Sequence, residues 1–136
     1  MCDMEKVLII EDNAMMRLFL TNYLSNEYEV VTTQSPQEGM AVLTGKAHEF
    51  SLVIADYYTP GTPEMKTLGH IRQSLGWQNI PMIILTDEDK SAQRIAAFEL
   101  GATDCLSKPF NPTELSMRMR GLVRMEERPA VYRPVA

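Results

Sequence analysis

Carboxylate, hydroxyl and ammonium side chains follow four short segments of this sequence that are predicted to be strands, and together they could bind a cation and a phosphoryl group. The residues are Glu11 and Asp12 after residues 6–10, Asp56 after residues 52–55, Thr86 after residues 81–85, and Lys108 after residues 103–107. Three carboxylates brought to one place repel one another, so they need compensating positive charge. Their hard oxygen atoms suit Mg²⁺, while Lys108 adds a positive charge and Thr86 a hydrogen-bond donor.

A set of this kind is suited to holding a phosphoryl group. No Ser–His or Cys–His pair is placed for acyl transfer, since His48 and His70 fall on a predicted loop and a predicted helix away from these residues. A carboxylate is therefore the candidate nucleophile, because carboxylates can form acyl phosphates. Asp56 is central among the three acids, and Glu11 and Asp12 flank it.

Each of these residues also has a purely structural interpretation. Glu11 and Asp12 could cap a helix, because carboxylates favour helix N-termini. Asp56 and Thr86 could simply end their strands, and Lys108 could belong to a turn before a helix. The joint pattern of acid pair, lone Asp, Thr and Lys on successive strand ends is more specific than any single member.

The elements that must position these residues alternate regularly along the chain. Strands are predicted at residues 6–10, 28–32, 51–56, 81–86 and 103–107. Helices are predicted at residues 13–25, from 36 to near 45, from 62 to Gly76, from about 90 to 100, and from 112 onward. Each strand-to-strand interval leaves room for a crossover helix, which predicts a parallel sheet with helices on both faces. The carboxyl ends of the strands then share one edge.

Apolar side chains recur at helical spacing within the predicted helices. They are Met16, Phe19, Leu20, Tyr23 and Leu24 in the first helix, Met65, Leu68, Ile71 and Leu75 in the third, and Leu115, Met119, Leu122 and Val123 in the fifth. Cap-and-proline signals at Ser35-Pro36-Gln37-Glu38 and Asn111-Pro112-Thr113-Glu114 open the second and fifth helices, and Gly101 ends the fourth.

Composition narrows the classes of function. The 136 residues fit one domain, 45% of them are hydrophobic, and the net charge is −5, which argues against direct nucleic-acid binding. No apolar run is long enough for a membrane span, and residues 1–5 lack signal-peptide features, so we expect a cytoplasmic location. The two cysteines, Cys2 and Cys105, form no disulfide or metal-binding framework.

The chain closely resembles the receiver domain of two-component response regulators. The matching stretches are Val7-Leu8-Ile9-Ile10-Glu11-Asp12-Asn13, Leu52-Val53-Ile54-Ala55-Asp56, Pro60-Gly61, Ile83-Ile84-Leu85-Thr86, and Gly101-Ala102-Thr103-Asp104 leading to Lys108-Pro109-Phe110. The resemblance covers residues 5–125, which we take as the domain, and residues 126–136 are expected to be a tail or the start of a linker. It implies a flavodoxin-like doubly wound (βα)5 sandwich with the parallel sheet order 2-1-3-4-5.

The resemblance also implies a set of roles. Asp56 would accept a phosphoryl group from a sensor histidine kinase or a phosphotransfer protein. Glu11, Asp12, Asp56 and the backbone carbonyl of Tyr58 would hold Mg²⁺. Lys108 and Thr86 would contact the phosphoryl oxygens, and Lys108-Pro109 would be a cis peptide. Such a domain is not an enzyme beyond its own phosphorylation and dephosphorylation. The surface of the fourth helix, fifth strand and fifth helix would contact an output domain or partner protein, or a second copy in a homodimer.

Three departures from the family's pattern concern the neighbourhood of this site. Cys105 stands where the family usually has an aromatic residue, so we expect a smaller change in the fifth strand and a larger one at residues 87–90 on activation. Asp87 stands where a small residue is usual. Thr62-Pro63-Glu64 replaces a more usual Met-Asp-Gly.

Three other interpretations compete with this one. A haloacid-dehalogenase-like phosphatase would need an acid two residues after the nucleophile, and Tyr58 occupies that position. A flavin-binding module would need a Ser/Thr/Gly-rich phosphate loop after the first strand, which residues 13–17 do not offer. A degenerate receiver would act by protein contact only, which Asp87 and Cys105 leave open.

Overall fold

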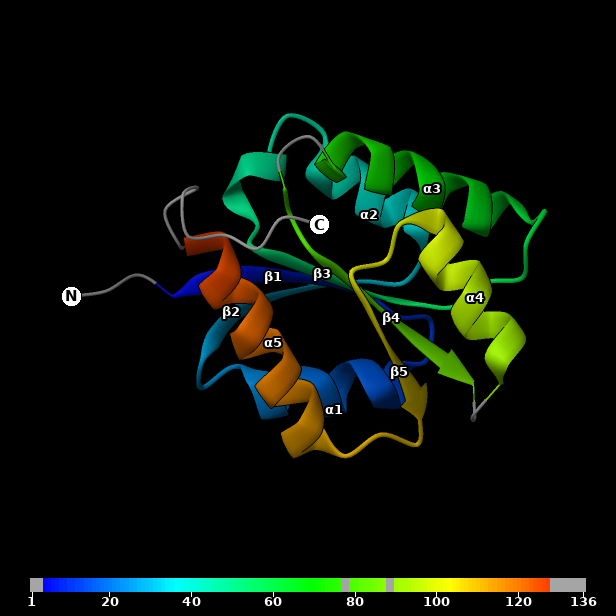
Figure 1. Ribbon diagram of the computed structural model, residues 1–136. Helices are drawn as coiled ribbons and strands as arrows, with labels where there is room; N and C mark the ends of the chain where they lie inside the picture. Colours follow the sequence, from blue (N-terminus) through cyan, green and yellow to red (C-terminus); the bar gives the residue numbers. More distant parts are fainter. Residues whose placement is uncertain (1–3, 77–78, 88–89, 128–136) are drawn as a thin grey trace.

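The computed structural model describes residues 4–76, 79–87 and 90–127, and these form a five-stranded sheet between two layers of helices (Figure 1). The strands are β1 (Glu5–Ile10), β2 (Tyr28–Thr33), β3 (Leu52–Asp56), β4 (Met82–Asp87) and β5 (Asp104–Lys108). The helices are α1 (Ala14–Leu24), α2 (Pro36–Leu43), α3 (Pro63–Gly76), α4 (Ser91–Leu100) and α5 (Pro112–Glu127), with a short 3₁₀ helix η1 (Ala47–Glu49).

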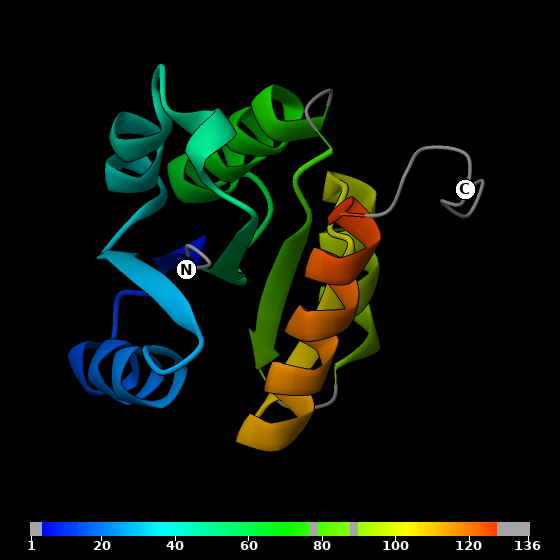
Figure 2. The ribbon, with the colours of Figure 1, turned by 90° about the vertical axis from the view of Figure 1, so that its left-hand side faces the viewer.

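The sheet has the predicted order β2-β1-β3-β4-β5, and every neighbouring pair is parallel. Helices α1 and α5 lie on one face of the sheet, and α2, α3 and α4 lie on the other (Figures 1 and 2). This is the doubly wound α/β sandwich that the alternation of strands and helices predicts.

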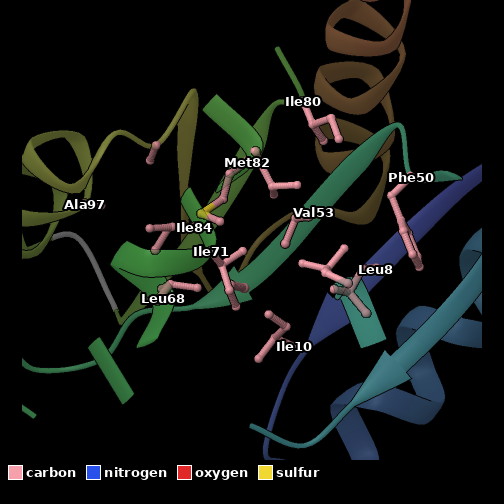
Figure 3. Close-up of a cluster of buried hydrophobic side chains, with 14 of the residues drawn as sticks. Leu8, Ile10, Phe50, Val53, Leu68, Ile71, Ile80, Met82, Ile84 and Ala97 are labelled. Atoms are coloured by element: carbon pink, nitrogen blue, oxygen red, sulfur yellow. The ribbon is translucent and has the colours of Figure 1, made fainter. Parts of the chain in front are cut away.

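Each face of the sheet has its own hydrophobic cluster. Figure 3 shows the cluster beneath α2, α3 and α4, where Leu68 and Ile71 of α3 pack over Ile10, Val53 and Ile84. The opposite cluster joins α1 and α5 to Val7, Ile9, Ile54 and other strand residues. Strands β1, β3 and β4 are therefore buried on both faces, which explains why their sequences are continuous apolar runs rather than alternating ones.

The helix starts and stops follow the chemistry of their end residues. The Ser35 hydroxyl accepts a hydrogen bond from the backbone N–H of Glu38 at 3.2 Å. Asn111 caps α5 by accepting from the N–H of Thr113 at 2.8 Å. Gly101 ends α4 with a φ of 112°, a left-handed conformation that glycine adopts without strain. These signals confirm the predicted starts of α2 and α5 and the predicted end of α4.

The apolar side chains that recur at helical spacing in the first helix are only partly buried. Leu20 and Leu24 are buried and Met16 is partly buried, but Phe19 and Tyr23 are 42% and 38% exposed. Their rings stack on each other with centroids 5.9 Å apart. The outer edge of the apolar stripe of α1 therefore remains in solvent.

Smaller differences concern the ends of elements. Strands β4 and β5 each end one residue later than predicted, which makes Lys108 the last residue of β5. His48 lies in η1 rather than in a loop. Helix α5 continues to Glu127, two residues past the predicted domain limit of 125. The limits of the domain themselves stay a prediction. Cys2, residues 88 and 89 of the predicted 87–90 response, and residues 128–136 of the predicted tail lie outside the described residues.

Within the described ranges, none of the helices combines the length and the apolar character that a membrane crossing would need.

Candidate functional site

Strand register brings the two most buried acids together. Ile10 of β1 lies beside Ala55 of β3, so the next residues, Glu11 and Asp56, lie side by side at the carboxyl ends of these strands. On the other side of β3, Asp87 of β4 lies beside Lys108 of β5. The carboxyl ends of the four strands thus deliver their polar residues to one edge of the sheet, as the sequence predicts.

Lys108 is the cation at the centre of this edge. Its Nζ lies 2.6 Å from Oδ1 of Asp56 and 2.9 Å from Oε1 of Glu11. Glu11 is 1% and Asp56 7% exposed, so these two acids would be costly to bury without a positive partner. The peptide bond between Lys108 and Pro109 is cis, as the resemblance implies.

The buried environment changes the proton affinities of these groups. Burial and then the neighbouring Glu11 raise the pKa of Asp56 to about 8, against the opposing effect of Lys108. Burial opposes ionisation of Glu11 as well, but interactions with Asp56, Lys108 and the Asn13 N–H hold its pKa below the usual value. Burial disfavours the charge on Lys108, yet Asp56 and Glu11 raise its pKa. Lys108 therefore stays charged between the two acids, and Asp56 is the acid that takes up a proton more readily.

The loop from β1 to α1 is held by hydrogen bonds at each residue. Glu11 Oε2 accepts from the N–H of Asn13 at 3.1 Å, and the Asn13 side chain accepts from the N–H of Met16 at 2.9 Å. One guanidinium nitrogen of Arg17 donates to the carbonyls of Glu11 at 2.8 Å and of Asp12 at 3.0 Å. Each oxygen of the Glu11 carboxylate has one hydrogen-bond partner, Lys108 or the N–H of Asn13, whereas the Asp12 side chain is exposed.

The acids at this edge are suited to a metal ion. Glu11, Asp12 and Asp56 each offer a carboxylate oxygen, and these three atoms all lie within 4.8 Å of one another. Carboxylate oxygens are the ligands that Mg²⁺ and Ca²⁺ prefer. The exposed Asp12 opens the cluster to solvent on one side, so an ion with bound water can reach it. The residues present therefore fit a hard divalent cation.

Thr86 and Tyr58 complete the set of predicted site residues. Thr86 is fully buried at the end of β4, and its hydroxyl lies 3.2 Å from that of Ser107. Tyr58 is partly buried two residues past β3, and its own hydroxyl is buried with no hydrogen-bond partner among the described residues. The role of its backbone carbonyl as a metal ligand stays a prediction.

Two of the residues that depart from the family's pattern, Cys105 and Asp87, lie in strands next to the site. Cys105 is a free thiol, 8% exposed, and is the second residue of β5. Asp87 is exposed, and its N–H donates to the side chain of Gln93 at 2.7 Å, which ties the end of β4 to α4. Asp87 therefore adds no charge to the buried part of the site.

Sequence reasoning missed two residues that touch the predicted site. The hydroxyl of Ser107 shares a hydrogen bond with that of Thr86, and nothing about a serine at this position of the sequence indicated a role in the site. Arg17 stands in the first turn of α1, where a cation is unfavourable because it faces the positive end of the helix dipole. That unusual position was the available signal, and the two carbonyls that Arg17 engages explain it.

Fold and site together define a class of protein: doubly wound parallel α/β proteins with three acids and a lysine at the carboxyl edge of the sheet. The chain belongs to the response regulator receiver domain family, whose sequence model matches residues 7–120.

Related proteins and solved structures agree with this assignment. The chain is 32% identical over 120 residues to the transcriptional regulatory protein ResD of Bacillus subtilis, covering 88% of this chain and 48% of that protein. It is 35% identical over 122 residues to the transcriptional regulatory protein PmrA of Pectobacterium parmentieri, covering 90% and 54%. The chain thus spans about half the length of these curated relatives.

A crystal structure of a response regulator receiver domain protein from Clostridium thermocellum matches with a TM-score of 0.79 and 26% identity, covering 91% of this chain and 98% of that one. A putative response regulator from Chloroflexus aurantiacus matches with a TM-score of 0.78 and 28% identity, covering 90% and 99%. The family match supports the receiver interpretation over the phosphatase and flavin-binding interpretations.

Proposed function

We propose that this receiver domain takes part in a two-component phosphorelay by accepting a phosphoryl group on Asp56. The donor is a sensor histidine kinase or a phosphotransfer protein. The domain acts as a signalling switch in the cytoplasm and catalyses only its own phosphorylation and dephosphorylation. The observation that carries the proposal is the contact of the buried Asp56 carboxylate with Lys108, within reach of Glu11 and Asp12. Incubation with acetyl phosphate and Mg²⁺ tests it, because the intact mass should rise by one phosphoryl group.

The side chains have separate parts in this reaction. An oxygen of Asp56 attacks phosphorus while the bond from phosphorus to the donor's histidine nitrogen breaks, and that nitrogen later takes up a proton from solvent. Lys108 balances the charge of the attacked phosphoryl group, and the Thr86 hydroxyl donates a hydrogen bond to one of its oxygens. Bound Mg²⁺ would neutralise charge on the carboxylates and on the phosphoryl oxygens.

Removal of the Asp12 carboxylate should weaken Mg²⁺ binding by about tenfold or more, because a direct ligand contributes at least as much as the groups that orient one. Glu11 is engaged by Lys108 and Asn13, so we expect it to act mostly through water. The measurement is a Mg²⁺ titration of Asp12→Ala followed by amide shifts of residues 11–13 and 56–58. Asp87→Ala removes another exposed acid, at the end of β4, and should leave the affinity unchanged. Equal affinities of Asp12→Ala and the unsubstituted protein would place the metal elsewhere.

The surface of α1 supports docking of a phosphodonor protein beside Asp56. Met15, Leu18, Phe19 and Tyr23 are exposed there. A hollow of about 440 Å³ lined by Asn13, Met15, Met16, Phe19 and Lys108 joins this apolar surface to the site. A donor histidine must come within bonding distance of Asp56, so its protein must cover the neighbouring surface.

The surface of α4, β5 and α5 is the proposed contact for an output domain, a partner protein or a second copy of the domain. Ile95 and Phe98 on α4 and Met117 on α5 are 58%, 50% and 63% exposed. Lys108 is the last residue of β5 and Thr86 lies beside Ser107 of β5, so contacts with a phosphoryl group can bias the conformation of this surface.

Beryllofluoride, a mimic of the phosphoryl group, should therefore change amide shifts along α4, β5 and α5, and should raise the sedimentation coefficient if the domain dimerises through this surface. Phe98→Ser should reduce that rise, whereas Leu18→Ser, at a similarly exposed apolar position of α1, should not. Shifts confined to α2 and α3 would contradict the assignment.

A further inference from the structure

Arg17 engages both carbonyl groups of the loop that presents the acid pair. Its guanidinium nitrogen lies 2.8 Å from the carbonyl oxygen of Glu11 and 3.0 Å from that of Asp12. These two carbonyls precede α1, which begins at Ala14, so the hydrogen bonds of the helix do not include them. An arginine fixed in this way is a brace across the loop, because a planar guanidinium loses little further freedom when it binds two acceptors.

Backbone hydrogen bonds fix both ends of the loop between β1 and α1. The N–H of Glu11 donates to the carbonyl of Thr33 at 3.0 Å, which anchors the start of the loop to β2. The N–H of Arg17 donates to the carbonyl of Asn13 at 3.0 Å, which anchors its end to α1. Between these anchors lies Asp12, whose side chain is exposed and whose carbonyl is held by Arg17. Arg17 therefore holds the residue of the acid cluster that has the least other support.

We propose that Arg17 is a positioning residue for the cation site, because it fixes the main chain at Glu11 and Asp12 so that their carboxylates converge with that of Asp56. This inference rests on the proposed function, in which the acid cluster holds Mg²⁺. Arg17 touches neither the cation nor the phosphoryl group in this role. Its two acceptors are carbonyl oxygens, which are themselves hard ligands, and engaging both leaves the carboxylates as the oxygens that meet the cation.

The charge of Arg17 and its bracing role have opposite effects on cation binding. A positive charge held against this loop repels Mg²⁺, so by Coulomb's law alone its removal would tighten binding. Loss of the brace lets the loop move and spreads the carboxylates, so by geometry its removal weakens binding. The sign of the change therefore separates the two effects.

Mg²⁺ titrations of the metal-free protein, followed by amide shifts of residues 11–13 and 56–58, provide the test. Arg17→Met should weaken Mg²⁺ binding by about tenfold, the lower end of the effect seen when groups that orient metal ligands are lost. Arg17→Gln retains one donor without the charge and should lose less. Arg120→Met removes an exposed arginine that pairs with Glu27 at 2.6 Å, and it should leave the affinity unchanged.

Unchanged or tighter binding in Arg17→Met would overturn the inference while leaving the proposed function intact. If the unsubstituted protein failed to bind Mg²⁺, the proposed function would fail first and the inference with it. Should Arg17→Met not fold, a Mg²⁺ affinity of Arg17→Gln equal to that of the unsubstituted protein would overturn the inference as well.

Discussion

Asp56→Asn is expected to abolish phosphorylation by acetyl phosphate in the presence of Mg²⁺. The amide of Asn is a poor nucleophile, and it removes the oxygen that would form the acyl phosphate. The substitution keeps the size of the side chain, so the buried site at the end of β3 can remain packed. Intact mass spectrometry should show the mass of one added phosphoryl group for the unsubstituted protein and none for the variant.

The neighbouring acid Asp87 supplies a matched control for this experiment. It is also the last residue of its strand, but it is exposed and lies outside the acid cluster. Asp87→Asn should therefore accept the phosphoryl group as the unsubstituted protein does. A full mass increase in Asp56→Asn would show that another residue is the acceptor. No increase in the unsubstituted protein would support the alternative in which this domain acts by protein contact only.

The architecture could be predicted from the sequence because its signals are local and repeated. Continuous apolar runs such as residues 52–55 indicate strands buried on both faces, and capping residues such as Ser35 and Asn111 mark helix starts. Once the strands are parallel, their carboxyl ends share an edge, so Glu11, Asp56 and Lys108 must come near one another. Their contacts across 52 and 97 residues of chain follow from topology rather than from spacing.

Features that depend on differences of a few ångströms in the positions of side chains or loops could not be predicted from the sequence. An apolar pattern places Phe19 and Tyr23 on the same stripe as Leu20, but only the width of the neighbouring surface decides which of them is buried. The raised pKa of Asp56 depends on its burial and on its distance from Glu11 and Lys108. The contact of Arg17 with two carbonyls depends on the path of a loop that has no periodic pattern.

Lys108→Met should destabilise the metal-free protein by about 2 kcal/mol near neutral pH. Removing one partner of a buried ion pair typically costs about 3–5 kcal/mol. The cost should be smaller here because the Lys108 side chain is 24% exposed, so solvent already screens part of the interaction. The free energy of unfolding can be measured by urea denaturation in the presence of EDTA. Lys6→Met, which breaks the surface pair with Glu49, should change it much less.

A double-mutant cycle separates the charge effect from the loss of packing. In a Glu11→Gln/Asp56→Asn background, no buried carboxylate faces Lys108, so the lysine becomes the unpaired charge. Lys108→Met should then be neutral or stabilising, which reverses its sign. An equal loss in both backgrounds would show that the aliphatic part of Lys108, rather than its charge, stabilises the site.

The raised pKa of Asp56 makes the free energy of unfolding depend on pH. Its pKa is about 8 in the folded protein and near 4 in the unfolded chain, so between these values the folded state binds more protons than the unfolded one. The contribution of Asp56 to stability is therefore fully present below about pH 4 and is lost as the pH rises toward 8. Asp56→Asn removes this loss, and the variant should gain stability relative to the unsubstituted protein between pH 5 and 8. The slope of that gain is at most about 1.4 kcal/mol per pH unit.

Without Lys108 the carboxyl groups of the folded protein hold their protons to higher pH, so Lys108→Met should lower the free energy of unfolding more at pH 8 than at pH 6. A cost that is independent of pH would mean that Lys108 does not balance these acids.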